Sequence, residues 1–448
     1  MFKRILIANR GEIALRIIRC CREMDIESVI VYSQADDKSL PVIMATHAVC
    51  IGPAKATKSY LNQEAIIETA IKMKCDAIHP GYGFLSENAE FARKCEDNGI
   101  VFIGPSSDII KNMGDKQSAR KLMIENDVPV VPGSKNILTS IEEAKDLAKE
   151  IGYPVLLKAS AGGGGKGMRK AYSKEELEHA YNTAKAEAKA AFGNDDMYME
   201  KLIINPHHIE FQILADKCGN TIYLGERDCS IQKNNQKLLE EAPSNILDEG
   251  LRAKMGEVAV RAAKAAKYFS AGTIEFVVDE AKNFYFIEMN TRIQVEHPVT
   301  EEITGIDLIR EQLRIAAGMK LSISQEDIVI QKHAIECRIN ALTPGTINFL
   351  HFPCGYGVRV ESHVYTGYEV SPYYDSMIGK IIVSGNTRLE AIRRLRRALE
   401  ELIIEGIDSN FEFMHLLTYH PVFLKGNYDT GFWEKHHETI ENWDREGK

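Results

Sequence analysis

Apolar residues in the first quarter of the chain alternate between short unbroken runs and longer amphipathic segments. The runs at residues 5–8 and 28–32 have the length of buried strands, and residues 11–24 between them place apolar side chains on one helical face. The same pattern predicts helices over 62–73 and 87–98 and strands over 75–78 and 100–103. Because strands that alternate with helices form parallel sheets, residues 1–113 are predicted to form a doubly wound α/β domain.

The middle region places two lysines in distinctive positions. Asp115 has the side chain of an N-cap and predicts a helix over 116–125, which puts Lys116 beside a helix N-terminus suited to anions. Taken alone, this position favours a solvated lysine. Lys158 lies on a predicted strand. The remaining elements predicted here are helices over 141–151 and 174–191 and strands over 153–159, 168–172 and 198–203.

The last third of the chain predicts a smaller α+β domain. Strands are predicted over 333–340 and 357–361, and the segment 373–383 is followed by a helix over 388–402. The predicted domains are residues 1–113, 114–329 and 330–448.

The stretch KASAGGGGKGMR, residues 158–169, contains a run of glycine that contributes no packing and needs another explanation. The P-loop template fails because Ser160 stands where its first glycine belongs, and a dinucleotide turn fails because a strand follows the run instead of a helix. A glycine loop between two strands favours a flap over nucleotide phosphates, and a disordered linker is the alternative from composition alone.

Two strands at 273–279 and 284–290 flank a four-residue loop and predict a β-hairpin. With Asp279 paired to Phe284, Glu275 lies opposite Glu288, the two Cβ atoms about 5 Å apart. Strand alternation adds Asn290 and Arg292 to the face of Glu288. Carboxylate and amide oxygens are hard ligands of the kind that Mg²⁺ prefers, and unpaired buried carboxylates are costly, so a magnesium site is favoured over a solvated face.

Composition narrows the class of protein. The 448 residues are 44% hydrophobic, and 55 Lys and Arg against 64 Asp and Glu give a net charge of −9 without a basic block, which disfavours nucleic acid as a partner. Nine cysteines without CxxC spacing predict reduced core thiols in the cytoplasm. The first apolar run is interrupted at Asn9 and Arg10, too early for a signal peptide or a membrane span.

Two local motifs leave alternatives open. The loop HPGYGF at 79–84 follows a strand at the carboxyl edge of the first sheet, so that His79 and Tyr82 either line a site or form a structural turn. The tetrapeptide AIKM at 70–73 is similar to the segment that presents the modified lysine of biotin carrier domains, but its helical pattern argues against attachment at Lys72.

Taken together, the two lysines, the glycine flap and the carboxylate hairpin resemble the ATP-grasp superfamily. Long motifs narrow the resemblance to biotin carboxylase and cover essentially the whole chain: ANRGEIALRIIR (8–19), HPGYGFLSEN (79–88), KASAGGGGKGMR (158–169), ERDCSIQ (226–232), EEAPS (240–244), FIEMNTRIQVEHPVTE (286–301), ECRINA (336–341) and YYDSMIGK (373–380). The resemblance implies an N-terminal biotin carboxylase domain, an ATP-grasp domain with a mobile glycine-rich lid at about 131–203, and a C-terminal biotin carboxylase domain.

The resemblance also implies roles for individual residues. ATP would contact Lys116, Lys158, Gly164, Gly165, Glu200, Lys201, Leu202, Ile203, His208, Gln232, Asn235, Glu275 and Glu288, and two Mg²⁺ or Mn²⁺ ions would be held by Glu275, Glu288 and Asn290. Bicarbonate and biotin would contact Lys237, Arg292, Gln294, Val295, Glu296, Arg338 and Tyr82. Glu296 would be the general base and Arg338 would stabilise the biotin enolate, with Arg292 and Lys237 completing the catalytic set. From spacing alone, an internal ion-pair network is an equal alternative for Arg292, Glu296 and Arg338.

The implied reaction is the ATP- and bicarbonate-dependent carboxylation of biotin on a carrier protein through carboxyphosphate. It is expected to be the first half-reaction of acetyl-CoA carboxylase, in fatty-acid biosynthesis, with pyruvate or propionyl-CoA carboxylase as alternatives. The expected partners are the biotin carboxyl carrier protein, carboxyltransferase subunits and a second copy of the chain, with no nucleic acid and no membrane. Biotin is expected as a substrate, not bound covalently to this chain.

Two departures from the family pattern affect this interpretation. Asn235 replaces the usual histidine in KNNQK, so that residue's contact with nucleotide is in question. The segment Leu342 to Gly345 is shorter than usual, which could alter partner docking without altering the chemistry.

Other function classes remain open from the sequence. Another ATP-grasp ligase would share the nucleotide site but acylate an amine, and a nucleotide-binding scaffold would bind ATP without turnover. A biotin carrier would require biotin on Lys72. The segment RIQVEHPVTE and Arg338 favour bicarbonate and biotin.

We expect the double substitution Gly164→Val and Gly165→Val to raise the KM for ATP while leaving the fold intact, because side chains would hinder the approach of backbone amides to phosphate. Steady-state kinetics and circular dichroism of the two proteins provide the measurement. Unchanged ATP kinetics would refute the lid interpretation.

Overall fold

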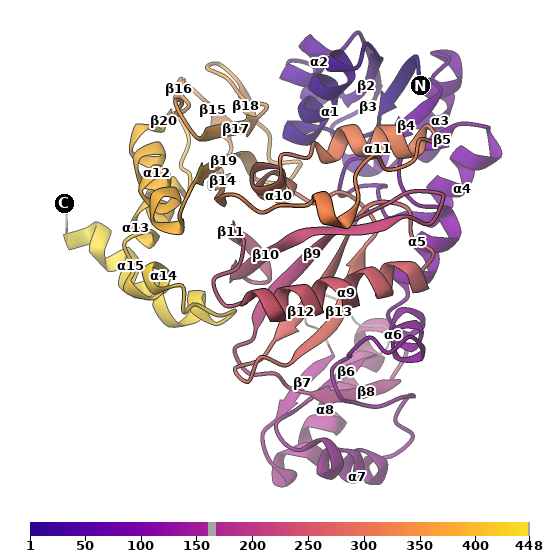
Figure 1. Cartoon of the computed structure of the whole chain (residues 1–448), viewed down its shortest axis with the longest axis vertical. Coiled ribbons are helices and arrows are strands. Elements are labelled where there is room, and N and C mark those ends of the chain that lie inside the picture. Colours follow the sequence, from indigo (N-terminus) through magenta and orange to yellow (C-terminus); the bar gives the residue numbers. More distant parts are fainter. Residues whose placement is uncertain (160–166, 447–448) are drawn as a thin grey trace. The chain divides into compact units, whose positions relative to one another are not determined.

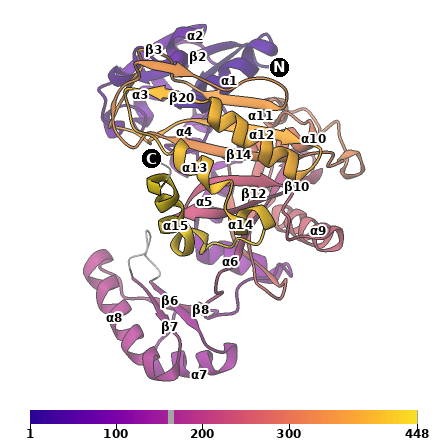
Figure 2. The same cartoon turned by 90° about the vertical axis from the view of Figure 1, so that its left-hand side faces the viewer.

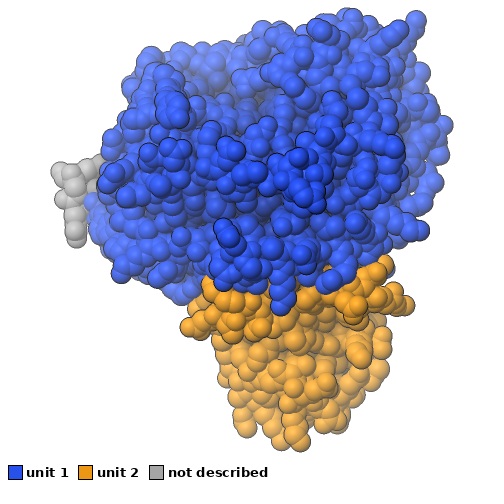
Figure 3. Space-filling view, in the orientation of Figure 1, with its two compact units in different colours: residues 1–119, 207–276, 288–448 blue, residues 120–206, 277–287 orange. Residues whose placement is uncertain are grey.

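The computed structural model describes residues 1–159 and 167–446, so that Gly164 and Gly165 lie outside the described residues. The chain forms two compact units, which Figure 3 distinguishes by colour. Unit 1 contains residues 1–119, 207–276 and 288–448, and unit 2 contains residues 120–206 and 277–287. The predicted lid, 131–203, lies within unit 2.

The N-terminal part of unit 1 is a parallel sheet with strand order β3-β2-β1-β4-β5, as the alternating pattern predicted. Alternate side chains of β1 enter two different cores: Ile5 and Ile7 pack with helix α1, whereas Leu6 packs with α3 and α4. Helices on both faces of a parallel sheet make this a doubly wound fold. The elements are β1 (Arg4–Ile7), α1 (Gly11–Glu23), β2 (Glu27–Ser33), α2 (Leu40–Met44), β3 (His47–Gly52), α3 (Gln63–Lys72), β4 (Ala77–His79), α4 (Ala89–Asp97), β5 (Val101–Phe102) and α5 (Ser107–Gly114), with 3₁₀ turns at Gln34–Asp36 and Ala56–Lys58.

An eight-stranded sheet lies mainly in unit 1, with strand order β13-β12-β9-β10-β11-β14-β19-β17, and residues 277–278 of β12 and 284–287 of β13 belong to unit 2. Its strands are β9 (His207–Ala215), β10 (Thr221–Lys233), β11 (Gln236–Ala242), β12 (Ser270–Val278), β13 (Phe284–Asn290), β14 (His333–Asn340), β17 (Val358–Ser362) and β19 (Met377–Gly385). The predicted C-terminal domain therefore contributes three strands to the sheet of the predicted middle domain. Neither the hydrophobic pattern nor the motif spacing indicated this continuity.

Helices cover the large sheet on both sides, as Figures 1 and 2 show. Helix α9 packs on β9 and β10, and α12 packs on β14 and β19. The remaining helices are α9 (Glu249–Ala265), α10 (His297–Thr304), α11 (Leu308–Ala316), α12 (Arg388–Glu401), α13 (Phe411–Leu417), α14 (Pro421–Lys425) and α15 (Phe432–Glu446), with a 3₁₀ turn at Gln325–Asp327. Two small ribbons pair β15 (Gly345–Thr346) with β18 (Glu369–Val370) and β16 (Phe349–His351) with β20 (Ile403–Glu405).

Unit 2 is built around a three-stranded antiparallel sheet of order β7-β6-β8. Its elements are α7 (Ile141–Ile151), β6 (Val155–Ala159), β7 (Met168–Ala171), α8 (Lys174–Phe192) and β8 (Met197–Lys201). Small residues of α7 and α8, including Ala148 and Ala184, pack against Leu157 and Met199 of the sheet. Helix α6 (Lys116–Glu125) begins where the sequence predicted, because Asp115 accepts a hydrogen bond from the amide of Ser118 at 2.7 Å.

The cysteines differ in part from the sequence prediction. All nine are free, and six are buried, but Cys50, Cys218 and Cys354 are exposed. The prediction of core thiols is therefore wrong for these three, because they lie on an edge strand, in a turn and in a loop. Among the described helices, no stretch is long and apolar enough to cross a membrane.

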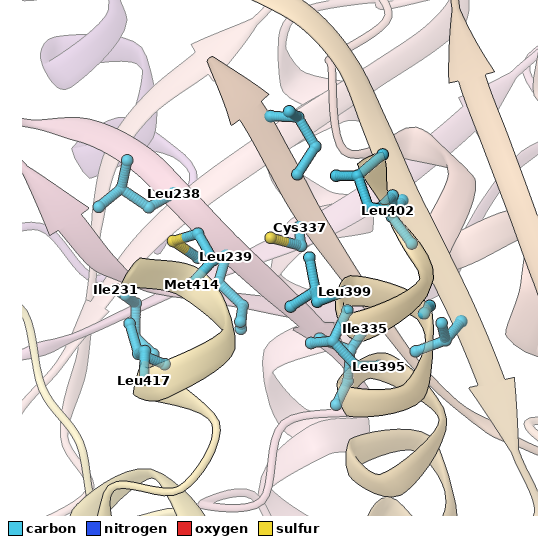
Figure 4. Close-up of a cluster of buried hydrophobic side chains, with 14 of the residues drawn as sticks. Ile231, Leu238, Leu239, Ile335, Cys337, Leu395, Leu399, Leu402, Met414 and Leu417 are labelled. Carbon is cyan, nitrogen blue, oxygen red and sulfur yellow. The ribbon is translucent and has the colours of Figure 1, made fainter. Parts of the chain in front are cut away.

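The core beneath α12 and α13 provides a test of the packing. Figure 4 shows Leu395 and Leu399 of α12 beside Ile335 and Cys337 of β14. Because Leu395 is fully buried, Leu395→Ala is expected to lower the free energy of unfolding by about 2–5 kcal/mol, measured by urea denaturation. Leu389→Ala on the same helix is the control, since this side chain is 49% exposed, and a loss of similar size in both variants would contradict the packing described.

Candidate active site

A buried ammonium group joins three carboxylates in the large sheet. The Nζ atom of Lys237, on β11, lies 2.5 Å from Glu296 Oε1, 2.6 Å from Glu210 Oε2 and 3.3 Å from Glu275 Oε1. The carboxylates come from β9, β12 and the N-cap of α10, and all three are buried. Buried negative charges are costly unless they are paired, so this cluster depends on its cations.

Arg338 of β14 connects Glu296 to a fourth buried carboxylate. Its Nη2 atom lies 3.0 Å from Glu296 Oε2, and its Nε atom donates to Glu240 Oε1 at 2.7 Å. Burial raises the pKa of Glu240 to about 7 despite Arg338, and the charge of Glu296 adds to the effect. Burial acts in the same direction on Glu296, but Lys237 and Arg338 hold the pKa of that carboxyl well below its usual range. Glu296 is thus ionised at neutral pH, the state that a general base requires.

Arg227 of β10 contacts Glu210 of this cluster and is completely buried. Its five N–H groups donate to five acceptors: Glu210 Oε1 at 2.5 Å, Gln212 Oε1 at 2.7 Å, Thr300 Oγ1 at 2.9 Å, Thr273 Oγ1 at 3.1 Å and Gln294 Oε1 at 2.7 Å. A guanidinium group has five donors, so none is left unsatisfied. The acceptors belong to β9, β12, α10 and the segment before it, and Arg227 therefore fixes these elements to one another.

Glu275 accepts hydrogen bonds from several predicted site residues. Its Oε1 atom accepts from Asn290 Nδ2 at 2.7 Å and from Gln294 Nε2 at 2.9 Å, and its Oε2 atom lies 2.8 Å from His208 Nε2. His208 Nδ1 in turn lies 2.8 Å from Gln232 Nε2. Burial alone would lower the pKa of His208, but the charge of Glu275 and its hydrogen bond raise it.

The predicted metal ligands fit a hard cation in part. Glu275 is buried, whereas the side chain of Glu288 is 42% exposed, and burial together with the charge of Glu275 raises the pKa of Glu288. A divalent cation would relieve this repulsion. The amide nitrogen of Asn290 faces Glu275 while its oxygen accepts from Arg292, so this amide must turn before its oxygen can bind a metal. Strands β12 and β13 are neighbours in the sheet, as predicted, and the direct pairing of Glu275 with Glu288 stays a prediction.

A second group of side chains could also hold a metal ion. The ligand atoms of His208, Glu210 and Glu275 lie within 4.8 Å of one another. Glu210 is already neutralised by Arg227 at 2.5 Å and Lys237 at 2.6 Å, and a third cation there would face two positive neighbours. We therefore favour the oxygen set of the hairpin.

The predicted bicarbonate residues are held by different neighbours, and Gln294 shares its partner Glu275 with Lys237. Arg292 donates to Asn290 Oδ1 at 3.0 Å and to Glu87 Oε2 at 2.9 Å, and Gln294 donates to Glu275. The carbonyl of Val295 accepts a hydrogen bond from the ammonium group of Lys380.

The predicted nucleotide residues are divided between the two units. Lys116, His208, Glu275 and Glu288 belong to unit 1, and the Nζ atom of Lys116 lies 3.8 Å from Glu288 Oε2. In unit 2, Lys158 of β6 forms an ion pair with Glu200 of β8. The predicted strand 198–203 ends earlier, at Lys201, whose ammonium group donates to the carbonyls of Gly152 and Tyr153 at 3.1 and 2.7 Å. The amide of Leu202 bonds to Pro154 O at 3.0 Å, and Ile203 is half-buried.

The turn between β10 and β11 accounts for Asn235 in structural terms. Lys233 pairs with Gln236, so Asn234 and Asn235 form a two-residue loop, and their φ angles are 52° and 64°. Positive φ at both loop positions is typical of a type I′ turn and favours asparagine. The same register places Gln232 opposite Lys237, so the turn sets two predicted site residues side by side.

The loop after β4 places His79 in a structural turn, while a site role for Tyr82 stays a prediction. His79 is fully buried, and its Nδ1 atom accepts from the amide of Gly81 at 3.0 Å. Burial lowers its pKa to about 3, so His79 is a neutral structural residue of the turn. Tyr82 is less buried, and its hydroxyl donates to Glu12.

Comparisons with known proteins agree with this arrangement. The family models described as biotin carboxylase N-terminal domain, carbamoyl-phosphate synthase L chain ATP binding domain and biotin carboxylase C-terminal domain match residues 1–110, 115–324 and 336–435. The chain is 54% identical over 443 residues to biotin carboxylase 1 of Bacillus subtilis, covering 97% of this chain and 98% of the relative. The chain belongs to the biotin carboxylase family.

Solved structures show the same relationship. A biotin carboxylase complex from Campylobacter jejuni has a TM-score of 0.92 and 50% identity, covering 97% of this chain and 99% of that one. The biotin carboxylase domain dimer of Hydrogenobacter thermophilus 2-oxoglutarate carboxylase, in complex with MgADP, ADP and bicarbonate, has a TM-score of 0.91 and 50% identity, covering 98% and 99%. The predicted family, its mixed α/β architecture and its membership of the ATP-dependent ligases are confirmed.

Sequence reasoning about this biotin carboxylase family member missed several residues of the buried cluster. Glu210, Arg227 and Glu240 each contact a predicted catalytic or substrate residue, and Glu87 holds Arg292. Arg227 and Glu240 lie within the motifs ERDCSIQ and EEAPS. Their place in these motifs could have marked them as candidate site residues. Their partners could not be assigned because strand register across distant segments is not visible in one sequence.

The buried carboxyl of Asp228, beside Arg227, predicts a pH effect on stability. It accepts from Ser230 Oγ at 2.6 Å and Ser244 Oγ at 2.9 Å, and burial raises its pKa to about 7. Between the pKa that Asp228 has in the unfolded chain and about 7, the native state binds more protons than the unfolded state, so the free energy of unfolding falls as pH rises. From pH 5 to pH 8 the free energy of unfolding of the wild type should fall by about 2–3 kcal/mol more than that of Asp228→Asn. Urea denaturation at each pH provides the measurement. Parallel pH profiles would show that Asp228 ionises normally.

Proposed function

We propose that this chain carboxylates biotin on a carrier protein, using ATP and bicarbonate and passing through carboxyphosphate. The supporting observation is the buried, ionised Glu296, held between Lys237 and Arg338 at the start of α10. The proposal also rests on the family relationship, since the relatives carry the name biotin carboxylase and one related structure contains MgADP and bicarbonate.

In this proposal Glu296 is the general base. Lys237, Arg292, Gln294 and Val295 bind bicarbonate, and Glu296 removes its proton so that an oxygen can attack the γ-phosphate. The proton neutralises Glu296, so Lys237 and Arg338 no longer face a negative charge at this carboxyl group.

Release of Arg338 from Glu296 links the two stages of the reaction. Arg338 stays anchored to Glu240 Oε1 through Nε at 2.7 Å and Nη2 at 2.5 Å, while the N–H of Nη2 that faced Glu296 becomes available to another anion. Breakdown of carboxyphosphate gives CO₂ and phosphate. The phosphate accepts the ureido proton of biotin, and the guanidinium group stabilises the enolate oxygen before the nitrogen attacks CO₂. Tyr82 is proposed to contact biotin.

The nucleotide residues are part of the same proposal. Lys116 and Lys158 neutralise phosphate oxygens, the backbone of Gly164 and Gly165 covers the phosphates, and further contacts come from Glu200, Lys201, Leu202, Ile203, His208, Gln232 and Asn235. Glu275, Glu288 and Asn290 would hold two Mg²⁺ or Mn²⁺ ions, whose charge offsets that of the phosphates during transfer. The three sequence domains, 1–113, 114–329 and 330–448, and the lid at 131–203 are retained as proposals.

The proposed partners are a biotin carboxyl carrier protein, carboxyltransferase subunits and a second copy of the chain. A related structure is described as a dimer, which supports the homodimer. We propose acetyl-CoA as the final acceptor and the cytoplasm as the compartment. Solved relatives near 50% identity include domains of 2-oxoglutarate carboxylase and pyruvate carboxylase, so the acceptor must be identified with the purified carrier and transferase.

We expect the purified protein to hydrolyse ATP in a bicarbonate-dependent reaction that free biotin stimulates and ammonia does not. Glu296→Gln should lower kcat by at least about 100-fold, because the amide cannot accept the proton. Phosphate release and ¹⁴C-carboxybiotin formation provide the measurements.

Glu257→Gln on α9 is the matched control, since this carboxylate is exposed. Amine-dependent turnover would indicate another ATP-grasp ligase. ATP binding without any turnover, with Glu296→Gln indistinguishable from wild type, would indicate a scaffold.

A further inference from the structure

Three family motifs that lie far apart in the sequence meet at one buried ion pair. Lys380 ends the motif YYDSMIGK, Glu12 lies in ANRGEIALRIIR, and Tyr82 lies in HPGYGFLSEN. The Nζ atom of Lys380 is 3.2 Å from Glu12 Oε1, and the Tyr82 hydroxyl donates to the same oxygen. None of the roles assigned above explains Lys380 or Glu12.

Burial makes this pair energetically demanding. The side chain of Lys380 is 0% exposed and that of Glu12 is 1% exposed. Among the described residues, Lys380 is the only cation that forms an ion pair with Glu12. An ion pair of this kind contributes little net stability compared with apolar residues of the same size, although removing one partner is costly. Its presence at the meeting point of three motifs therefore requires another reason.

The ammonium group also contacts the catalytic segment. Besides Glu12, Lys380 donates to the carbonyl oxygen of Val295. That carbonyl belongs to the peptide unit that leads into Glu296, the N-cap of α10. Fixing this peptide plane fixes the direction in which the Glu296 carboxylate leaves the backbone.

Strand register brings Lys380 to the site from a second direction. In the antiparallel pair of β14 and β19, Lys380 lies directly opposite Arg338. Directly opposite residues have Cβ atoms about 5 Å apart on one face of a sheet. Two cations so placed need separate anions, and the structure supplies Glu12 for Lys380 and Glu240 with Glu296 for Arg338.

The phenol of Tyr82 is oriented by the same pair. Because its hydroxyl donates to Glu12, the oxygen of Tyr82 keeps its lone pairs for a hydrogen-bond donor. A cyclic urea offers such donors in its N–H groups. Glu12 thus contacts both Tyr82, the proposed biotin residue, and Lys380, whose ammonium group binds the carbonyl of Val295 in the proposed bicarbonate segment.

We propose that Lys380 and Glu12 are positioning residues that couple the bicarbonate segment at Val295 and Glu296 to the cyclic urea site at Tyr82. This inference rests on the proposed function for its substrates. Lys380 orients the base through the Val295 carbonyl, and Glu12 orients the Tyr82 hydroxyl. Neither side chain takes part in a proton transfer.

The test compares Lys380→Met, Glu12→Gln and the double variant. Removing one charge leaves the other buried and unpaired, so each single variant should be less stable than wild type, whereas the double variant regains most of the thermal midpoint. We expect Lys380→Met and the double variant to lower kcat/KM for bicarbonate in biotin-free ATPase assays by about 10- to 100-fold, since small misplacements of a base have effects of that size. Glu12→Gln should mainly raise the KM for free biotin.

A matched control separates positioning from stability. Arg388, on α12, forms a largely buried ion pair with Glu241 at 2.7 Å, and neither residue contacts the site. Arg388→Met should destabilise the protein but leave the KM for bicarbonate unchanged. If the double variant regains activity together with stability, or if Arg388→Met shows the same kinetic defect, Lys380 is merely structural.

Hydrogen exchange provides a readout that does not depend on activity. Mass spectrometry should show faster deuterium uptake in a peptide spanning residues 294–299 for Lys380→Met and the double variant, but not for Arg388→Met. Unchanged uptake would overturn the inference even if the enzyme is active. An inactive wild type with the expected exchange pattern would refute the proposed function and keep the positioning role.

Discussion

The structure of unit 1 depends on compensating a group of buried carboxylates. Glu210, Glu240, Glu275 and Glu296 lie within one sheet and the helix start beside it, and each would be costly to bury alone. Lys237, Arg227 and Arg338 distribute their donors among them. Each of these carboxylates has a cationic partner, and the cations keep the buried Glu296 ionised.

This network explains why the large sheet runs through two predicted sequence domains. β11 carries Lys237 and Glu240, and β14, which pairs with β11, carries Arg338. If the C-terminal strands formed a separate sheet, Arg338 could not reach both Glu240 and Glu296. The two-residue turn at Asn234 and Asn235 adds a second constraint, because its register places Gln232 opposite Lys237. The turn and the buried ion pairs therefore constrain neighbouring strands of one sheet, β10, β11 and β14.

In unit 2 the charged site residues are paired differently from those in unit 1. The small sheet of unit 2 packs on helices rich in alanine, and its predicted nucleotide residues, Lys158 and Glu200, form an ion pair with each other. Lys201 is engaged with backbone carbonyls, which orders the end of β8. The ion pair of Lys158 and Glu200 is thus local and partly exposed, whereas the charges around Lys237 and Arg338 in unit 1 are mostly buried and shared among several strands. Buried, shared charges are expected to be the more sensitive to substitution.

The sequence by itself determined the local elements and the kind of chemistry. Alternating patterns predicted the first sheet, Asp115 marked the start of α6, and the motifs around Glu275 and Glu296 identified the family. Only the tertiary structure decided which charges meet. Glu12, Glu210, Arg227 and Lys380 have no sequence neighbours that indicate their partners, and the continuity of the large sheet is equally invisible. The physical reason is that hydrophobic periodicity and turn chemistry act over a few residues, whereas strand register and buried ion pairing join segments up to several hundred residues apart.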